Sequence, residues 1–290
     1  MTTTAPELVT DVDAAPIPPA RRRRGRGRRQ HALLRLRGEI PLSARIALGL
    51  IGVVCLIALW WIAATVWSGD TFLLPTPPET WSAGVELYRS GDLWTDFKAS
   101  AERVLWGYAI SMAVGVVAGT AIGSFRSAEA FSEAGIGFLR YIPATAFTGL
   151  FLIWLGIDEA PKIALIVVGT VFFNILMTAD VVRAVPRDMI STAYTLGAGR
   201  ARVLRKVTLP HSWPGIIDVA RINLAAAWLM LVVAELLAGE DGLGFRLVRA
   251  QRFRQIDTIF AILFVFGVIG VVSDLALRGL RNATAKWARP

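Results

Sequence analysis

The chain has 290 residues, of which 54% are hydrophobic and only 18% are charged, and its formal net charge is +9. Soluble domains contain about 45–50% apolar and about 25% charged residues, so this composition, with a mean hydropathy of +0.54, excludes an ordinary soluble protein. The positive charge does not indicate a nucleic-acid-binding surface, because ten of the 31 Lys and Arg residues lie between Arg21 and Arg45, ahead of the first long apolar run. A basic tail next to a membrane lies in solvent or near anionic lipid headgroups.

Residues 1–42 are rich in Ala, Pro, Thr and Arg and are predicted to form a disordered cytoplasmic tail, because they carry concentrated charge and little that could build a core. The first apolar run begins near Ile46, far from Met1, so it is predicted to be an uncleaved span and not a signal peptide. The single cysteine, Cys55, lies in this run and is expected to be a small side chain packed in the interior. Residues 43–290 are predicted to form one transmembrane domain.

Six apolar segments have about the 20 residues that a helix needs to cross a bilayer. They are expected near Ile46–Trp67, Arg103–Phe125, Ile136–Leu155, Ile163–Val182, Ile216–Ala238 and Thr258–Leu277. Basic residues are concentrated in the tail, in the connection between the fourth and fifth spans, and after the sixth span. The excess of Lys and Arg in cytoplasmic segments therefore predicts an all-α membrane protein with both termini in the cytoplasm.

The second span has a small residue at every fourth position, at Ser111, Gly115, Gly119 and Gly123. Helices in lipid associate through close backbone approach, which small residues permit. The pattern predicts a buried helix–helix face and is equally expected in any polytopic bundle.

Polar residues on the fourth span also share one helical face, at Thr170, Asn174 and Thr178. Polar groups at membrane depth must face a partner helix or a wet cavity. Two interpretations remain open, a lining of the transport path and ordinary hydrogen bonding between helices. The fifth span contributes further candidate path residues, which are Asn223, Trp228 and Glu235. Pairing or snorkelling near a span end would also explain Glu235 and Arg103.

The connection between the fourth and fifth spans, near 183–212, is the most informative part of the chain. Apolar residues recur along it at helical spacing, at Ala193, Leu196, Ala201 and Leu204. Gly197 and Gly199 then permit a break and a turn. A second basic helix is expected to follow and to stop at Pro210, where the chain re-enters the membrane. A helix, glycine and helix lying across the membrane face would suit docking to a soluble partner.

This connection resembles the membrane subunits of binding-protein-dependent ABC importers. The hallmark of that family is Glu-Ala-Ala, three residues, Gly, nine residues, Ile, one residue and Leu-Pro. The residues in register here are Ala193, Gly197, Val207 at the Ile position, Leu209 and Pro210. The chain departs from the pattern at two positions, where Ser191 replaces the Glu and Thr192 replaces the first Ala. The resemblance implies a loop that couples to the ATPase through Ser191, Thr192, Ala193, Leu196, Gly197, Ala198, Val207, Leu209 and Pro210.

The resemblance extends over nearly all of residues 45–287 and is closest to importers of nitrate, bicarbonate, taurine and aliphatic sulfonates. The segments that carry it are Leu74–Pro77, Arg140–Ala146, Leu152–Ile157 with Pro161 and Lys162, Ala226–Trp228, Glu235, and Gly242–Gly244. It implies a six-span type I importer permease fold in the bacterial inner membrane. It also implies a second permease subunit, expected to make a homodimer, two ATPase subunits, and an extracytoplasmic binding protein. ATP and magnesium would bind the ATPase, so no cofactor, catalytic residue or metal is assigned to this chain.

The chain contains no Gly-x-x-x-x-Gly-Lys-Ser/Thr sequence that could cradle phosphates, so it is expected to be a transport subunit and not an enzyme. The last outer loop carries Arg246, Arg249, Arg252 and Arg254. These arginines could raise the local concentration of an anionic solute or meet acidic residues of the binding protein. Within the membrane core, no strongly charged site is expected.

Three alternatives remain. The same importer class could move a small organic nutrient such as a vitamin precursor. A membrane-embedded enzyme would need inward-facing acids, bases or metal ligands, whereas the two histidines, His31 and His211, lie in the tail and beside the loop. A secondary transporter would be expected to show an inverted repeat, which the six spans lack.

Overall fold

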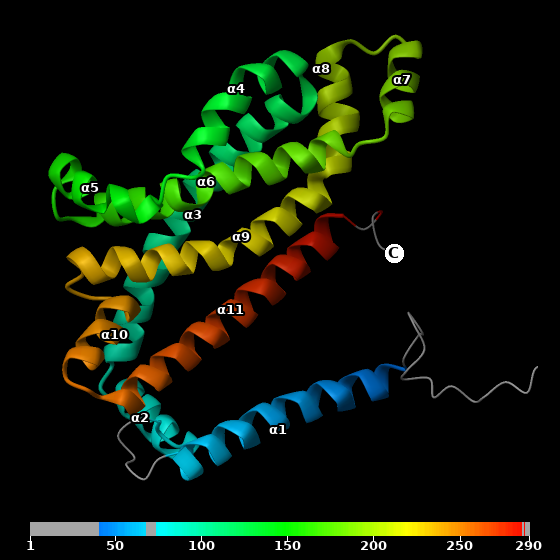
Figure 1. Cartoon of the computed structure of the whole chain (residues 1–290). Helices are drawn as coiled ribbons and strands as arrows, with labels where there is room; N and C mark the ends of the chain where they lie inside the picture. The colour runs from blue at the N-terminus through cyan, green and yellow to red at the C-terminus, as the bar shows by residue number, and fades with distance from the viewer. Residues whose placement is uncertain (1–40, 68–73, 286, 288–290) are drawn as a thin grey trace, which may run out of the picture. The chain divides into compact units, whose positions relative to one another are not determined.

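The computed structural model describes residues 41–67, 74–285 and 287, and the regular structure in them is helical (Figure 1). The contacts divide the chain into two compact units, residues 1–56 and residues 57–290, which are treated separately. The basic tail was predicted to be disordered over residues 1–42, and of these only residues 41 and 42 are among the described residues. Helix α1 spans Leu42–Trp67 and contains the first expected span. Cys55 is exposed on it and is not packed in the interior as expected, because none of the apolar window of this helix is buried in the chain.

Four other helices are long and apolar enough to cross a membrane. They are α3 (Asp92–Ser124), α6 (Glu159–Arg183), α9 (Leu209–Ala238, continuing the short helices that begin at Arg200), and α11 (Ile256–Thr284). Each matches one of the predicted spans, and Phe125, the last residue of the second predicted span, lies just beyond α3. α3 begins well before the predicted boundary at Arg103, because polar residues extend the helix beyond its apolar stretch.

The third expected span, Ile136–Leu155, is not one continuous helix. It is divided between α4 (Arg126–Leu139) and a pair formed by η2 (Ala144–Phe147) and α5 (Thr148–Leu155), and the two parts are bent by 77°. The break falls before Pro143, which has no amide N–H to donate and restricts the residue before it to extended conformations. The described residues therefore contain five continuous candidate spans, or six if the bent pair counts as one.

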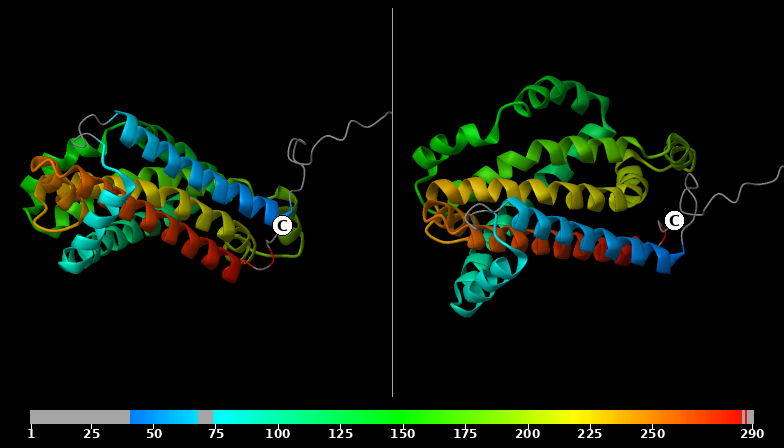
Figure 2. Two further views of the ribbon diagram at one scale, coloured as in Figure 1. Left: turned by 90° about the horizontal axis from the view of Figure 1, so that it is seen from below. Right: turned by 60° about the horizontal axis from the view of Figure 1, so that its bottom comes forward.

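Helices α3, α6 and α9 form the packed centre of the second unit, and α11 lies beside α9 in both views of Figure 2. The small-residue stripe of α3 packs on α6 as predicted. A Cβ added at Gly115 would lie 2.6 Å from the Asn174 Cβ, and one added at Gly119 would lie 2.6 Å from the Thr178 Cβ. The stripe therefore confirms the expected helix–helix face and explains why larger side chains do not fit there.

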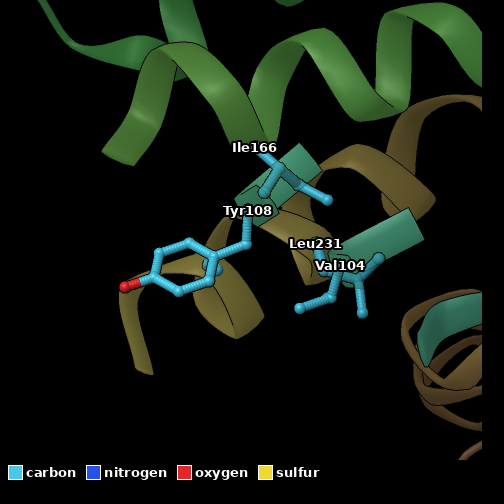
Figure 3. Close-up of a cluster of buried hydrophobic side chains, with 5 residues drawn as sticks. Val104, Tyr108, Ile166 and Leu231 are labelled. Atoms are coloured by element: carbon cyan, nitrogen blue, oxygen red, sulfur yellow. The ribbon is translucent and has the colours of Figure 1, made fainter. Parts of the chain in front are cut away.

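A cluster of buried side chains joins these three helices. It contains Val104 and Tyr108 from α3, Ile166 from α6, and Ala227 and Leu231 from α9, and Figure 3 labels four of them. The Tyr108 hydroxyl donates a hydrogen bond to the Ala220 carbonyl at 2.6 Å, so the one polar atom of the ring also links α3 to α9.

The remaining helices are shorter. α2 (Pro77–Arg89) contacts α11, and α10 (Leu243–Arg252) packs on α9 and α11. α7 (Arg187–Thr195) and α8 (Arg200–Val203) lie side by side beyond the end of α6, as Figure 1 shows. η3 (Leu204–Thr208) is a π-helical turn that joins α8 to α9.

Candidate functional site

The connection between α6 and α9 begins with helix α7, which ends in a Schellman motif. The Ala198 amide donates to the Ala193 carbonyl at 3.0 Å, and the Gly197 amide donates to the Tyr194 carbonyl at 2.9 Å. This motif requires a left-handed residue after the helix, and Gly197 has a φ of +79°. The predicted break at Gly197 is therefore present, and it has a specific backbone reason.

Helix α7 and the turn that follows it present apolar side chains to the outside of the chain. Leu196 is 81% exposed, and Met189 and Tyr194 are also exposed. Most of the nine residues assigned to the coupling loop lie on this exposed connection, whereas Ala193 and Ala198 are half-buried. A large apolar side chain held out on a turn whose backbone is fixed is suited to burial against another protein. Its role in coupling stays a prediction.

The second half of the connection differs from the sequence prediction. The basic helix does not stop at Pro210, because the chain stays helical from Arg200 through α9. The Leu209 amide donates to the Leu204 carbonyl, five residues back, so a π-type turn directly precedes Pro210 within this continuous helix. Val207 and Leu209 are half-buried in this continuous helix, so these motif residues connect the loop rigidly to a span.

Ser191 and Thr192, the two departures from the family pattern, are exposed on α7. The Ser191 hydroxyl donates to the Arg187 carbonyl of its own helix at 2.8 Å. Helix α7 therefore forms without the carboxylate that the family has at this position.

The polar residues of the fourth span lie in a hydrogen-bonded contact among α3, α6 and α9. The hydroxyl of Thr170 and the amide of Asn174 both donate to the Ser111 hydroxyl, at 2.7 and 2.8 Å. The Asn223 amide donates to the Asn174 side-chain oxygen at 2.7 Å. Thr170, Asn174 and Thr178 are fully buried. The geometry of Thr170 and Asn174 matches hydrogen bonding between helices, whereas the Thr178 hydroxyl has no hydrogen-bond partner among the described residues. The path-lining role of these residues stays a prediction.

Trp228 has a different environment. Its ring meets Phe266 of α11 edge-on, with centroids 6.1 Å apart. Its indole N–H is buried and has no acceptor among the described residues. The Trp228 N–H is therefore a donor that the described part of the chain leaves unsatisfied.

A buried charged cluster lies at the ends of α6 and α9 that are remote from α7. Arg103 of α3 is 3% exposed and binds three carboxylates, those of Glu235, Glu159 and Asp241. The Arg103–Glu235 and Arg103–Glu159 contacts are 2.7 and 2.5 Å. Lys162 adds a second cation 2.8 Å from Glu159. This cluster lies at the ends of spans, so the expectation that the membrane core holds no strongly charged site stays a prediction.

Glu235 is the central acceptor of this cluster. Its side chain is completely buried. Besides Arg103, it accepts a hydrogen bond from the Ser100 hydroxyl at 2.7 Å and one from the Gly244 amide at 2.7 Å. Glu235 therefore joins α3 to the start of α10, and this candidate path residue is fully satisfied within the described chain. Of the two explanations that the sequence offered for a charge near a span end, snorkelling and ion pairing, the structure shows ion pairing for Glu235.

Helix α10 is tied to α3 by a second set of contacts. Asp96 accepts hydrogen bonds from the Gly242 amide, at 3.0 Å, and from the Arg246 guanidinium, which also binds Asp92 at 2.9 Å. Arg246 is thus paired within the chain and does not contribute a free charge to the predicted basic loop. Arg249, Arg252 and Arg254 are exposed.

Sequence reasoning assigned no role to Ser100, Asp96, Glu159 or Asp241. The available signal was the presence of charged residues at the edges of apolar runs, which by itself does not identify partners. No group of three or more His, Cys, Asp or Glu side chains among the described residues is arranged to hold a metal ion.

Comparisons with known proteins identify the family. Residues 111–286 match the family described as "Binding-protein-dependent transport system inner membrane component". The chain is 32% identical over 259 residues to the taurine transport system permease protein TauC of Escherichia coli, covering 87% of this chain and 94% of that protein. It is 28% identical over 177 residues to the bicarbonate transport system permease protein CmpB of Synechococcus elongatus, covering 61% of this chain and 64% of that protein.

A solved structure has the same fold. An inward-facing structure of the MetNI methionine ABC transporter matches with a TM-score of 0.56 at 19% identity, covering 72% of this chain and 99% of the matched chain.

Proposed function

The chain belongs to the binding-protein-dependent inner membrane components, the permeases of ABC importers, and on that premise we propose that it carries a small oxyanion. The solute class comprises nitrate, bicarbonate, taurine and alkanesulfonates. The observation that carries this proposal is the similarity to the taurine and bicarbonate permeases, whose named solutes share an anionic group built on oxygen atoms.

The charge of α10 supports an anionic solute. Three arginines are exposed at the end of the helical bundle that is remote from α7, namely Arg249, Arg252 and Arg254. None of them has an ion pair within the part of the chain that the structure describes. By the predicted topology this end faces the outside. A basic surface there would raise the local concentration of an anion or bind acidic residues of a solute-binding protein.

The coupling partner is proposed to be an ATPase that binds the α7–α8 connection. Two such subunits, holding ATP and magnesium, would serve a pair of these permeases, with a binding protein on the opposite side. The fixed turn at Gly197 and the exposed Leu196 support this assignment, because they hold an apolar contact in a defined place. The continuous helix from Arg200 into α9 would transmit the movement of the ATPase to a span.

The test is transport by the reconstituted complex. The permease, its ATPase and its binding protein are placed in proteoliposomes, and uptake of radiolabelled taurine and of bicarbonate is measured with ATP and with a non-hydrolysable analogue. ATP-dependent uptake of either oxyanion is the expected result. Uptake of only an uncharged or cationic nutrient, such as a vitamin precursor, would contradict the solute assignment. ATP-independent uptake would contradict the proposed mechanism.

A further inference from the structure

A pocket of about 260 Å³ lies where the ends of α3 and α6 meet the starts of α4 and α7. Helix α8 and the turn η3 close its remaining side. Its wall contains buried apolar side chains, which are Ile122, Val182, Val185 and Val203. By the predicted topology this pocket lies at the cytoplasmic ends of the spans, next to the coupling connection.

The rim of the pocket is strongly basic. Four arginines line it, Arg126, Arg183, Arg187 and Arg200, and Glu129 is the one acidic residue that lines it. Arg183 is already bound to Glu129 at 3.2 Å and to Asp180 at 3.0 Å. The other three arginines are exposed, and none has an ion pair within the described residues. They come from three different helices and surround one opening, so their positive charges are held together by the fold.

An additional feature favours an anion at this place. Helix α4 begins at Arg126, and no side chain caps it. The first amide groups of a helix point outward without acceptors, and the helix dipole favours negative charge there. This helix start supplements the arginines and does not define the site alone.

We propose that this pocket binds the phosphate group of an anionic phospholipid. Guanidinium groups bind phosphate oxygens through paired hydrogen bonds, and basic pockets between spans on the cytoplasmic side suit anionic headgroups. A free phosphate ion would use the same arginines. The buried apolar wall favours a lipid, because a glycerol backbone and the first part of an acyl chain would cover it. The headgroup would join α4 and α6 to α7, and so would steady the coupling connection.

The contribution of the pocket is tested by substituting two arginines that have no ion pair within the described part of the chain. The full chain is purified with its ATPase in a neutral detergent, as wild type and as the Arg126→Gln/Arg200→Gln double variant. Arg202→Gln is the matched control, because Arg202 is exposed on the same connection and does not line the pocket. Native mass spectrometry follows titrations with phosphatidylglycerol, with phosphatidylcholine, and with inorganic phosphate.

Phosphatidylglycerol is expected to bind wild type more tightly than phosphatidylcholine. The double variant is expected to bind it about tenfold or more weakly, since each hydrogen bond to a charged group is worth a factor of this order. Arg202→Gln is expected to change binding by less than about twofold, as a lone exposed charge does.

Three results would overturn the proposal. Equal loss of binding in the control and the double variant would indicate attraction to the basic surface as a whole. Binding of inorganic phosphate that depends on Arg126 and Arg200, without a preference for phosphatidylglycerol, would indicate a free-anion site. Loss of the ATPase from the double variant with unchanged lipid binding would assign these arginines to the protein partner.

Discussion

Replacing Arg103 with leucine is expected to lower the stability of the chain by about 3–5 kcal/mol, the range for breaking a buried ion pair from one side. The Arg103 side chain is 4% exposed, and the Glu235 side chain is 0% exposed. After the substitution, Glu235 would keep its hydrogen bonds from Ser100 and Gly244 but would lose its cation. An unpaired buried carboxylate is costly because neither water nor an opposite charge stabilises it.

Two comparison variants separate this explanation from simple loss of packing. Asp241 binds the same arginine, but its side chain is 49% exposed. Asp241→Asn is therefore expected to cost less than about 1 kcal/mol. The double substitution Arg103→Leu/Glu235→Leu removes both buried charges and is expected to recover part of the loss.

The assay is the thermal unfolding of purified full-length protein in one detergent, followed by tryptophan fluorescence. The expected order of midpoints is wild type and Asp241→Asn, then the double variant, then Arg103→Leu. An Arg103→Leu protein that unfolds at the wild-type temperature would refute the reasoning. A double variant less stable than Arg103→Leu would also refute it, because relief of the unpaired charge would then be absent.

The packed centre yields two further predictions. Gly115→Val is expected to prevent correct packing of α3 on α6, because even a Cβ at this position would lie 2.6 Å from the Asn174 Cβ. The measurement is the yield of monodisperse protein. The control, Gly267→Val, is expected to match wild type, because a Cβ there meets nothing within 4 Å. Asn174→Leu is expected to leave the chain folded, since hydrogen bonds between membrane helices average only about 0.6 kcal/mol, but to reduce ATP-dependent uptake, because it removes a polar group from the predicted path. Unchanged uptake in assembled Asn174→Leu complexes would assign Asn174 to packing alone.

Features that depend on local sequence could be predicted. Ser111, Gly115 and Gly119 are spaced four residues apart, which places small residues on one side of a helix. Packing against a neighbouring helix follows from that spacing. The left-handed turn at Gly197 also follows locally, because glycine adopts positive φ without a steric penalty. The apolar length of each long span is likewise a property of consecutive residues.

Features that depend on distant partners could not be predicted. Arg103 and Glu235 are 132 residues apart, and nothing in either apolar run specifies that α3 and α9 meet there. Helical periodicity gives the residues that share a face, but not the helix that covers it. The same limit applies to Asn174, whose bonds to Ser111 and Asn223 depend on the packing of three helices.

Two helix boundaries at prolines were predicted wrongly, the continuous third span across Pro143 and the helix end at Pro210. Pro143 coincides with a break, whereas Pro210 lies in a continuous helix. The difference depends on the hydrogen bonds around each residue. At Pro210, the preceding π-turn has already shifted the acceptor of Leu209 to Leu204, and that shift has no clear signature in the amino-acid pattern.

The central claim is that the α7–α8 connection couples this permease to an ATPase, and Leu196→Asp tests it most directly. Leu196 is 81% exposed in the chain, so the substitution should not disturb folding of the permease. It would place an unpaired charge where an apolar contact is proposed, which is costly on burial. Gly197→Val adds a second perturbation, a strain of about 1–3 kcal/mol at a positive φ, and Arg202→Ala is the control.

The measurement is the recovery of the ATPase subunit on purified permease, together with ATP-dependent uptake in proteoliposomes. Both are expected to fall together in Leu196→Asp and in Gly197→Val, and to remain near wild type in Arg202→Ala. Full ATPase recovery with normal uptake in Leu196→Asp and Gly197→Val would contradict the account, because the connection would then not be the coupling element.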